Sequence, residues 1–229
     1  AGAVYLRCRR DSLPERSIYA AVGLRCQNCV SALPSGFAFP APNGVVIAPD
    51  FLGHGNSESP EGSLEPEAMT AALTEALHEV VDERFFLYGN SLGCLSALYL
   101  SSKSRASGIY LRNPPPLVEL ISKRLRYNWW NFGMAQLIVK QIPDRLNPQK
   151  NARQSQCPAL LVQSECDSLV PTRFQDLIAD CYSGELKKIV LNGADHGSPV
   201  PEPQFEEYIE AVTWLGHRVS ANQPLLKTN

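Results

Sequence analysis

A regular alternation between short apolar runs and longer amphipathic segments constrains the fold of this chain more than any other feature. The apolar runs have the length of strands and lie at 3–9, 17–24, 44–48, 84–88, 108–111, 159–162 and 188–191. Segments with the apolar spacing of helices lie at 66–81, 91–102, 172–181 and 205–219. Strands that alternate with helices form βαβ units, in which the strands run parallel. The sequence therefore predicts an α/β fold with a largely parallel sheet.

Two connections depart from this alternation. Residues 11–15 (DSLPE) are rich in turn formers, so a hairpin is expected between 3–9 and 17–24. Residues 114–157, which begin with three prolines and contain a Tyr-Asn-Trp-Trp cluster, are too many for an ordinary loop. Because exposed tryptophan pairs usually meet a partner surface, this segment is predicted to form a small cap-like insertion, with a plain pair of helices as the alternative.

Length and charge narrow the class of protein. The chain has 229 residues, which is the size of one domain, and we expect a single domain over 1–229. Its formal net charge is −2 and no basic stripe is present, so nucleic acid is not an expected partner. No apolar run approaches the roughly 20 residues that span a bilayer, so no membrane span is expected. The sequence indicates no oligomeric state.

The cysteines indicate the redox environment. There are seven, an odd number with irregular spacing, which suits reduced thiols and a cytoplasmic location better than a disulfide framework. Cys26 and Cys29 have the local spacing of zinc ligands, but the sequence contains no second pair to complete four ligands. The sequence therefore predicts no metal site.

The strongest chemical motif is residues 89–93 (GNSLG), which join the strand-like run 84–88 to a helical run. This is the G-x-S-x-G pattern in the strand, sharp turn and helix that it requires. The flanking glycines are needed because side chains two residues before and after the serine would collide in so tight a turn. Ser91 is therefore predicted as a nucleophile, and the N–H of Leu92 is predicted to face the developing oxyanion.

A serine hydroxyl needs a general base, and the chain has four histidines. His78 and His217 fall in predicted helices, and His54 lies early in the chain. His196 lies in a glycine-flanked loop just after the last predicted strand, from which a side chain can reach the carboxyl edge of a parallel sheet. His196 is therefore the predicted base.

The base needs a carboxylate to orient it. The apolar run that ends near Val162 leads directly into Glu165 and Asp167. Asp167 places the acid between the serine and the histidine in chain order, as this architecture expects. Glu165, which is nearer the strand, remains the alternative. Asp195 directly precedes the base and is interpreted as a structural or solvent-facing acid, because neighbouring loop side chains often diverge.

Together these residues resemble the α/β-hydrolase superfamily. The resemblance covers residues 17–215 and rests on motifs that occur in the family's order: D-x-x-G-x-G-x-S at 50–57, the turn around Ser91, the acid at Asp167, and G-x-x-H-G at 193–197. The segments at 45–57 and 161–171 are similar to those of monoacylglycerol-lipase-like and serine-aminopeptidase-like members. In such proteins, the residue matched by His54 shapes the backbone near the site.

The resemblance implies an α/β-hydrolase fold. We expect a mostly parallel sheet of about seven strands, one antiparallel edge strand fewer than usual, flanked by helices. The insertion at about 114–157 would be a small helical cap between the sixth and seventh family strands. The His-Gly pair that usually completes the family's oxyanion hole is replaced by residues 23–24. The second oxyanion donor is therefore expected to be the N–H of Arg25 or of Cys26.

The expected function is hydrolysis of an acyl substrate of small molecular size through a Ser-His-Asp triad and an acyl-enzyme. A carboxylester is the first expectation, and thioesters and small amides remain open. No organic cofactor is expected, because the triad supplies nucleophile, base and electrostatics. Two alternatives remain: a non-catalytic binding protein of the same fold, and an acyltransferase that uses the same triad. Fold resemblance alone decides neither the substrate nor the reaction.

Overall fold

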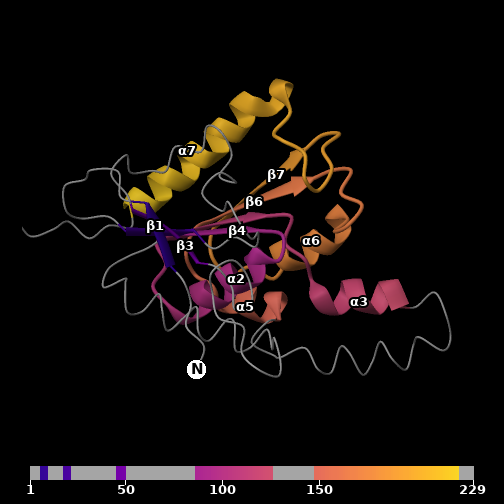
Figure 1. Cartoon of the computed structure of the whole chain (residues 1–229), viewed down its shortest axis with the longest axis horizontal. Helices are drawn as coiled ribbons and strands as arrows, with labels where there is room; N and C mark the ends of the chain where they lie inside the picture. The colour runs from indigo at the N-terminus through magenta and orange to yellow at the C-terminus, as the bar shows by residue number, and fades with distance from the viewer. Residues whose placement is uncertain (1–5, 10–17, 22–44, 50–85, 126–146, 222–229) are drawn as a thin grey trace, which may run out of the picture.

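The computed structural model describes residues 6–9, 18–21, 45–49, 86–125 and 147–221 (Figure 1). These residues contribute seven strands to one sheet, with the order β1-β3-β2-β4-β5-β6-β7. The strands are β1 (Leu6–Arg9), β2 (Ile18–Ala21), β3 (Val45–Pro49), β4 (Phe86–Asn90), β5 (Gly108–Arg112), β6 (Ala159–Ser164) and β7 (Leu186–Leu191). All neighbouring pairs are parallel except β1 and β3. The predicted parallel sheet of about seven strands is confirmed.

The predicted hairpin between the first two strands is wrong. β1 pairs antiparallel with β3, with Leu6 opposite Pro49, and does not adjoin β2. β2 pairs in parallel with β3 on one side and with β4 on the other. Both edges of β2 are therefore occupied, and β1 takes the free edge of β3 instead. Residues 11–15, which were expected to form the turn, lie outside the described residues.

The predicted helices 91–102, 172–181 and 205–219 correspond to α2, α6 and α7, whereas 66–81 lies outside the described residues. The described helices are α2 (Gly93–Lys103), α3 (Leu117–Leu125), α5 (Pro148–Gln154), α6 (Thr172–Ala179) and α7 (Phe205–Ala221), with a short 3-10 helix, η2 (Glu202–Gln204). None of these helices has the length and apolar character needed to cross a membrane.

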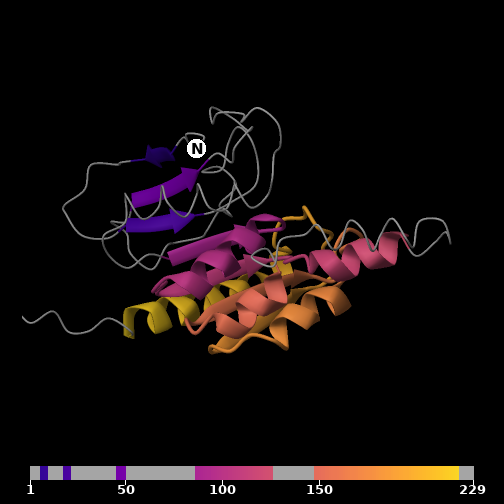
Figure 2. The ribbon, with the colours of Figure 1, turned by 90° about the horizontal axis from the view of Figure 1, so that it is seen from below.

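The helices form a layer on each face of the sheet. Figure 1 shows α7 on one side and α2, α5 and α6 on the other, and Figure 2 shows the same layers from below. Side chains alternate between the two interfaces along each strand: Leu87 and Ile109 pack toward α2, whereas Phe86 and Tyr110 pack toward α7. Because both faces are covered, the strands are apolar at consecutive positions rather than at alternate ones.

Both described helices of the predicted insertion contact the main layers. Lys123 of α3 places its ammonium group 5.0 Å from the centre of the Phe174 ring on α6. At the end of α5, the hydroxyl of the C-cap residue Ser155 lies 2.5 Å from that of Ser101 on α2. α5 therefore packs against α2 as part of the layer on that face. The residues between α3 and α5, which include the predicted tryptophan cluster, lie outside the described residues.

The contact between Gly108 and α7 gives a test of this layering. A Cβ atom at Gly108 would lie 2.5 Å from Cγ2 of Val219. We therefore expect Gly108→Ala to lower the free energy of unfolding by about 1–3 kcal/mol, the usual range for overpacking. Adding Val219→Ala removes the obstructing methyl group, so the double variant should lose less than the sum of the two single losses. Denaturant unfolding measures all three values, and simple additivity would contradict the contact.

Candidate active site

Ser91 lies at the turn between β4 and α2. Its backbone φ is +52°, a left-handed conformation that residues other than glycine rarely adopt. Ser91 is one residue beyond the end of β4, and its N–H donates to the carbonyl of Arg112 on β5 at 2.8 Å. Its carbonyl accepts the N–H of Cys94 at 2.9 Å. The strand's last interstrand bond and the helix's first turn thus hold the strained residue from both sides. This is the predicted strand, sharp turn and helix.

The glycine before the turn is required by a close approach of the backbone. A Cβ atom at Gly89 would lie 2.7 Å from Cα of Cys94 and 2.9 Å from its nitrogen. Atoms of the main chain cannot move aside as the end of a side chain can. The predicted steric need for glycine therefore holds at Gly89, and for Gly93 it stays a prediction.

Asp167 and His196 form a short hydrogen-bonded pair. Nδ1 of His196 lies 2.7 Å from Oδ2 of Asp167, whose side chain is wholly buried. The other carboxylate oxygen accepts the N–H groups of Leu169 at 2.9 Å and Val170 at 2.7 Å. Because both oxygens have donors, the carboxylate has a fixed orientation toward the imidazole.

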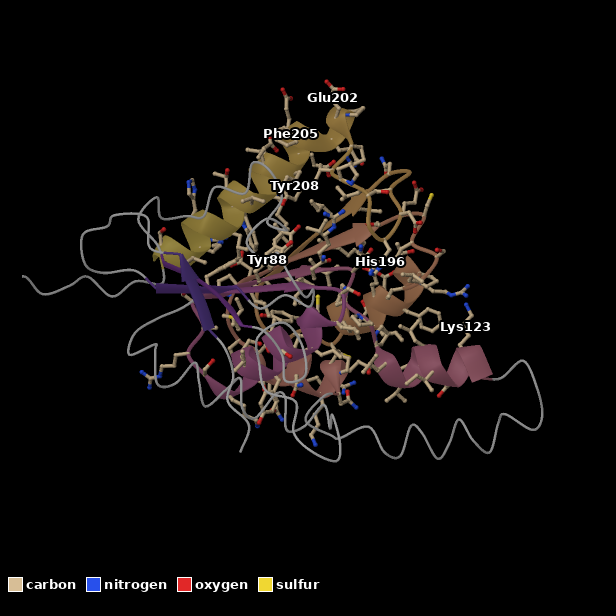
Figure 3. All side chains as sticks on the ribbon, viewed as in Figure 1. Tyr88, Lys123, His196, Glu202, Phe205 and Tyr208 are labelled. Atoms are coloured by element: carbon tan, nitrogen blue, oxygen red, sulfur yellow. The ribbon has the colours of Figure 1, made fainter. Side chains whose placement is uncertain are left out.

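The pair of Asp167 and His196 is hydrogen-bonded to Ser91. Nε2 of His196 lies 2.9 Å from Oγ of Ser91, so the three predicted side chains form one hydrogen-bonded series. The imidazole is mostly covered, with 19% of its side chain exposed. Figure 3 shows His196 beside the ends of β6 and β7, where a loop after the last strand was expected to place it.

The loops that carry the acid and the base are bonded to each other. The N–H groups of Glu165 and Cys166 donate to the carbonyls of Leu191 and Ala194, at 3.0 and 2.8 Å. The carboxylate of Glu165 accepts the N–H of Gly193 at 2.8 Å. Glu165, the alternative acid, therefore holds the loop of His196, while the described bonds of the His196 ring go to Asp167 and Ser91.

Asp195 has a similar bridging role. Its Oδ1 accepts the N–H of His196 at 2.7 Å and the N–H of Ser168 at 3.2 Å, so it joins the two loops. These N–H groups, that of His196 first, hold the pKa of the Asp195 carboxyl below its ordinary value. The interpretation of Asp195 as a structural acid agrees with these contacts.

Two residues at the end of β5 contact the site and were not predicted. The carbonyl of Arg112 accepts the N–H of Ser91, and its guanidinium donates to the carbonyl of Ser198. Asn113 is fully buried and donates from its side chain to the carbonyl of His196 at 3.0 Å. The criterion that identified Asp167, a polar side chain just after a buried strand, applies equally to Asn113.

A group of buried tyrosines lies in the core between the sheet and α7. The rings of Tyr88 and Tyr110 stack with centres 4.9 Å apart, and the hydroxyl of Tyr110 lies 3.4 Å from that of Tyr208. Figure 3 shows Tyr208 on α7 and Tyr88 on the sheet below it. Burial raises the pKa of all three phenols, although the charge of Arg112 opposes the shift. The phenols therefore stay neutral at physiological pH.

Cys94 lies three residues after Ser91, at the start of α2. Its thiol donates to the carbonyl of Arg112 at 3.3 Å, and burial raises its pKa well above the ordinary value. A fully buried, protonated thiol is a core group rather than a reactive one. In the part of the chain that the structure describes, no three His, Cys, Asp or Glu side chains gather as metal ligands would.

The remaining predicted residues fall into two groups. Leu92 is the residue before α2 and is 45% exposed beside Ser91, at a helix end where N–H groups lack intrahelical partners. His217 is exposed on α7, as its helical position suggested. Several other predicted residues lie outside the described residues: Arg25, Cys26, Cys29, His54 and His78.

The close approach at Gly89 predicts a large effect of one methyl group. Gly89→Ala should lower the free energy of unfolding by about 1–3 kcal/mol, because the added Cβ displaces the backbone of Cys94. Gly197 is the matched control: a Cβ there would meet nothing within 4 Å, so Gly197→Ala should change the value by less than about 0.5 kcal/mol. Chemical denaturation measures both, and equal losses would contradict the steric explanation.

The lowered pKa of Asp195 predicts a pH-dependent contribution to stability. A carboxyl with a lowered pKa stabilises the fold above its ordinary pKa, and this contribution is lost as the pH falls through the lowered value. Asp195→Ala should therefore melt below the wild type at pH 7, and the difference should narrow below about pH 4. Glu210→Ala, at an exposed site on α7, is the control. A difference that stays constant with pH would contradict this role.

Comparison with known proteins agrees with this geometry. A family model described as the alpha/beta hydrolase family matches residues 29–211. The fold is similar to that of a monoacylglycerol lipase from Paleococcus ferrophilus, with a TM-score of 0.65 at 19% identity over 94% of this chain and 99% of that one. It is also similar to MGS-M2, an alpha/beta hydrolase enzyme from a Medee basin deep-sea metagenome library, with a TM-score of 0.64 at 15% identity over 100% and 98% of the two chains.

A third similar structure is Est816, described as an N-acyl homoserine lactone degrading enzyme. Its TM-score is 0.62 at 17% identity over 93% of this chain and 96% of that one. Among curated protein sequences, none matches this chain. Structures at such low identity show the fold alone, and the family model extends over most of the chain, including all three residues of the hydrogen-bonded series. The chain belongs to the alpha/beta hydrolase family.

Proposed function

We propose that this protein is a serine hydrolase that cleaves an ester through an acyl-enzyme on Ser91. One observation carries the proposal: the series of bonds from Oγ of Ser91 through His196 to the buried carboxylate of Asp167, at 2.9 and 2.7 Å. Family membership supports a hydrolase, and this series supports the serine mechanism in particular.

In the first half of the proposed reaction, Oγ of Ser91 attacks the carbonyl carbon of the ester. Nε2 of His196 accepts the serine proton, and Asp167 keeps the Nδ1–H directed away from the serine so that the Nε2 lone pair faces Oγ. The imidazolium then gives this proton to the leaving alcohol as the carbon–oxygen bond breaks. The product of this half is an acyl group on Ser91 and a free alcohol.

In the second half, water attacks the acyl carbon and gives its proton to His196. Collapse of the tetrahedral intermediate returns that proton to Ser91 and releases the acid. Both intermediates carry an oxyanion, for which we propose the N–H of Leu92 and the N–H of Arg25 or Cys26. Loss of one such donor typically costs about 10²–10³ in rate.

The substrate class rests on chemistry that a serine triad performs most readily. Carboxylesters are the first candidates, and thioesters and small amides follow. Two of the similar structures are named as a monoacylglycerol lipase and as an enzyme that degrades a lactone, which is a cyclic ester. We propose a single domain in which the segment at 114–157 provides a cap over the acyl site, with α5 excepted because it packs against α2 in the main layer. An acyltransferase would use the same residues, and product analysis separates the two.

The free cysteines support a location of this protein in a reducing compartment. The four cysteines whose side chains the structure describes are free: Cys94, Cys157, Cys166 and Cys181. Structural disulfides are frequent in oxidising compartments and rare in the cytosol. A cytoplasmic location is therefore the one we propose.

Ser91→Ala tests the mechanism. A fluorophosphonate probe should label the wild type and not this variant, because only an activated serine attacks the probe. Ester turnover should fall by roughly 10⁶, as for loss of a nucleophile in the subtilisin triad. The melting temperature should stay near that of the wild type. In-gel detection of the probe and a panel of ester, thioester and amide substrates measure these outcomes.

Ser102→Ala is the matched control, because Ser102 lies on the same helix and its hydroxyl, among the described residues, bonds to the carbonyl of Tyr99. It should be labelled like the wild type. Retention of most activity in Ser91→Ala would exclude Ser91 as the nucleophile. A folded wild type that does not react would instead favour a non-catalytic binding protein.

A further inference from the structure

Asn113 follows β5 in a conformation that few residues adopt. Its φ is +49°, and its N–H donates to the carbonyl of Val162 at 3.0 Å. The β5–β6 bonding therefore continues one residue beyond the end of β5, and the chain then turns sharply. Asparagine and glycine tolerate this left-handed region better than other residues do.

The carboxamide of Asn113 uses every hydrogen-bonding group that it has. Oδ1 accepts the N–H of Ser164 at 2.9 Å. Nδ2 donates to the hydroxyl of Ser164 at 3.1 Å and to the carbonyl of His196 at 3.0 Å. The residue is fully buried, so these bonds replace all contact with water. A buried carboxamide with both ends satisfied fixes the segments that it joins.

Those segments carry the residues of the proposed mechanism. Ser164 ends β6, three residues before Asp167, and the carbonyl of Arg112, the neighbour of Asn113, accepts the N–H of Ser91. The backbone of His196 has one bond on each side: its N–H goes to exposed Asp195 and its carbonyl to buried Asn113. Asn113 thus gives the loop of His196 a fully buried attachment to the strands, beside the bond from Arg112 to Ser198.

We propose that Asn113 is a positioning residue that sets the distance between His196 and Ser91. The proposal rests on the serine mechanism proposed above. The bond at the His196 carbonyl fixes the backbone from which the imidazole extends, and the ring must span Asp167 and Ser91 at 2.7 and 2.9 Å. Displacement of a reacting group by about 1 Å can cost about 10²-fold in rate.

Two substitutions separate the side chain from the backbone. Asn113→Gly removes the carboxamide, and glycine accepts the positive φ without strain. Asn113→Asp keeps the shape and the acceptor for the Ser164 N–H, but the carboxylate has no hydrogen to give to the carbonyl of His196. If the donated bond positions the base, both variants should lose activity. If the side chain only fills space, Asn113→Asp should lose stability through its buried charge and keep kcat per active site unchanged.

The test measures kcat and KM with a soluble ester. The concentration of active sites is taken from the end-point of fluorophosphonate labelling, so that kcat is given per active site. For Asn113→Gly and Asn113→Asp, kcat should fall by about 10- to 100-fold while KM stays within about threefold. Asn151→Ala is the matched control, since Asn151 is another buried asparagine, on α5. It should lower the melting temperature and leave kcat per site unchanged. Unchanged kcat per site in both Asn113 variants would overturn the proposal.

A spectroscopic measurement tests the role of Asn113 independently of the proposed catalytic activity. The proton on Nδ1 of His196, bonded to Asp167, should give a downfield ¹H NMR resonance in the wild type. In both Asn113 variants, this resonance should broaden or move upfield, and in Asn151→Ala it should not. If the wild type is neither labelled nor active, the serine mechanism fails, and this resonance alone then tests the positioning role. A resonance unchanged in both Asn113 variants would overturn it.

Discussion

The parallel register of β4 to β7 is the constraint on which the site depends. In register, Asn90 lies opposite Arg112, Arg112 opposite Val162, and Ser164 opposite Leu191. The carboxyl ends of the four strands therefore reach one edge of the sheet together. Three loops begin there and carry Ser91, Asp167 and His196, so residues distant in sequence need only short side chains to meet. Ligand sites of open α/β sheets lie in this position for the same reason.

Hydrogen bonds between the loops then fix what the register brings together. Two acids that do not orient the base, Glu165 and Asp195, accept N–H groups of the loop that carries it. Arg112 and Asn113 add attachments from the end of β5. Arg112 bonds to the backbone of Ser91 and to the carbonyl of Ser198. Asn113 bonds to the carbonyl of His196. The polar groups that hold the loops in place therefore outnumber the three side chains proposed to take part in the reaction.

Prediction from the sequence succeeded for the turn around Ser91, where the signal was local. The G-x-S-x-G turn is determined by residues 89–93 and their immediate neighbours. Asp167 and His196, the proposed acid and base, could be selected because each follows a recognisable apolar strand. The pairing of β1 was predicted wrongly because strand order depends on which distant edges are free, and residues 11–15 hold no information on that. Asn113 was missed because an amide is neither nucleophile, acid nor base, and its three side-chain bonds go to residues far away in the chain.

The separations within the series of bonds have a consequence for the order of folding. Asp167 and His196 are 29 positions apart and belong to the consecutive unit β6–α6–β7, whereas His196 and Ser91 are 105 positions apart. Closing a longer loop costs more chain entropy, and contacts between distant residues slow folding. We therefore expect the acid and base loops to come together within their own βαβ unit first. Ser91 is expected to join them later, when β4 and β5 complete the sheet, so that the bond between Asp167 and His196 forms before the bond between His196 and Ser91.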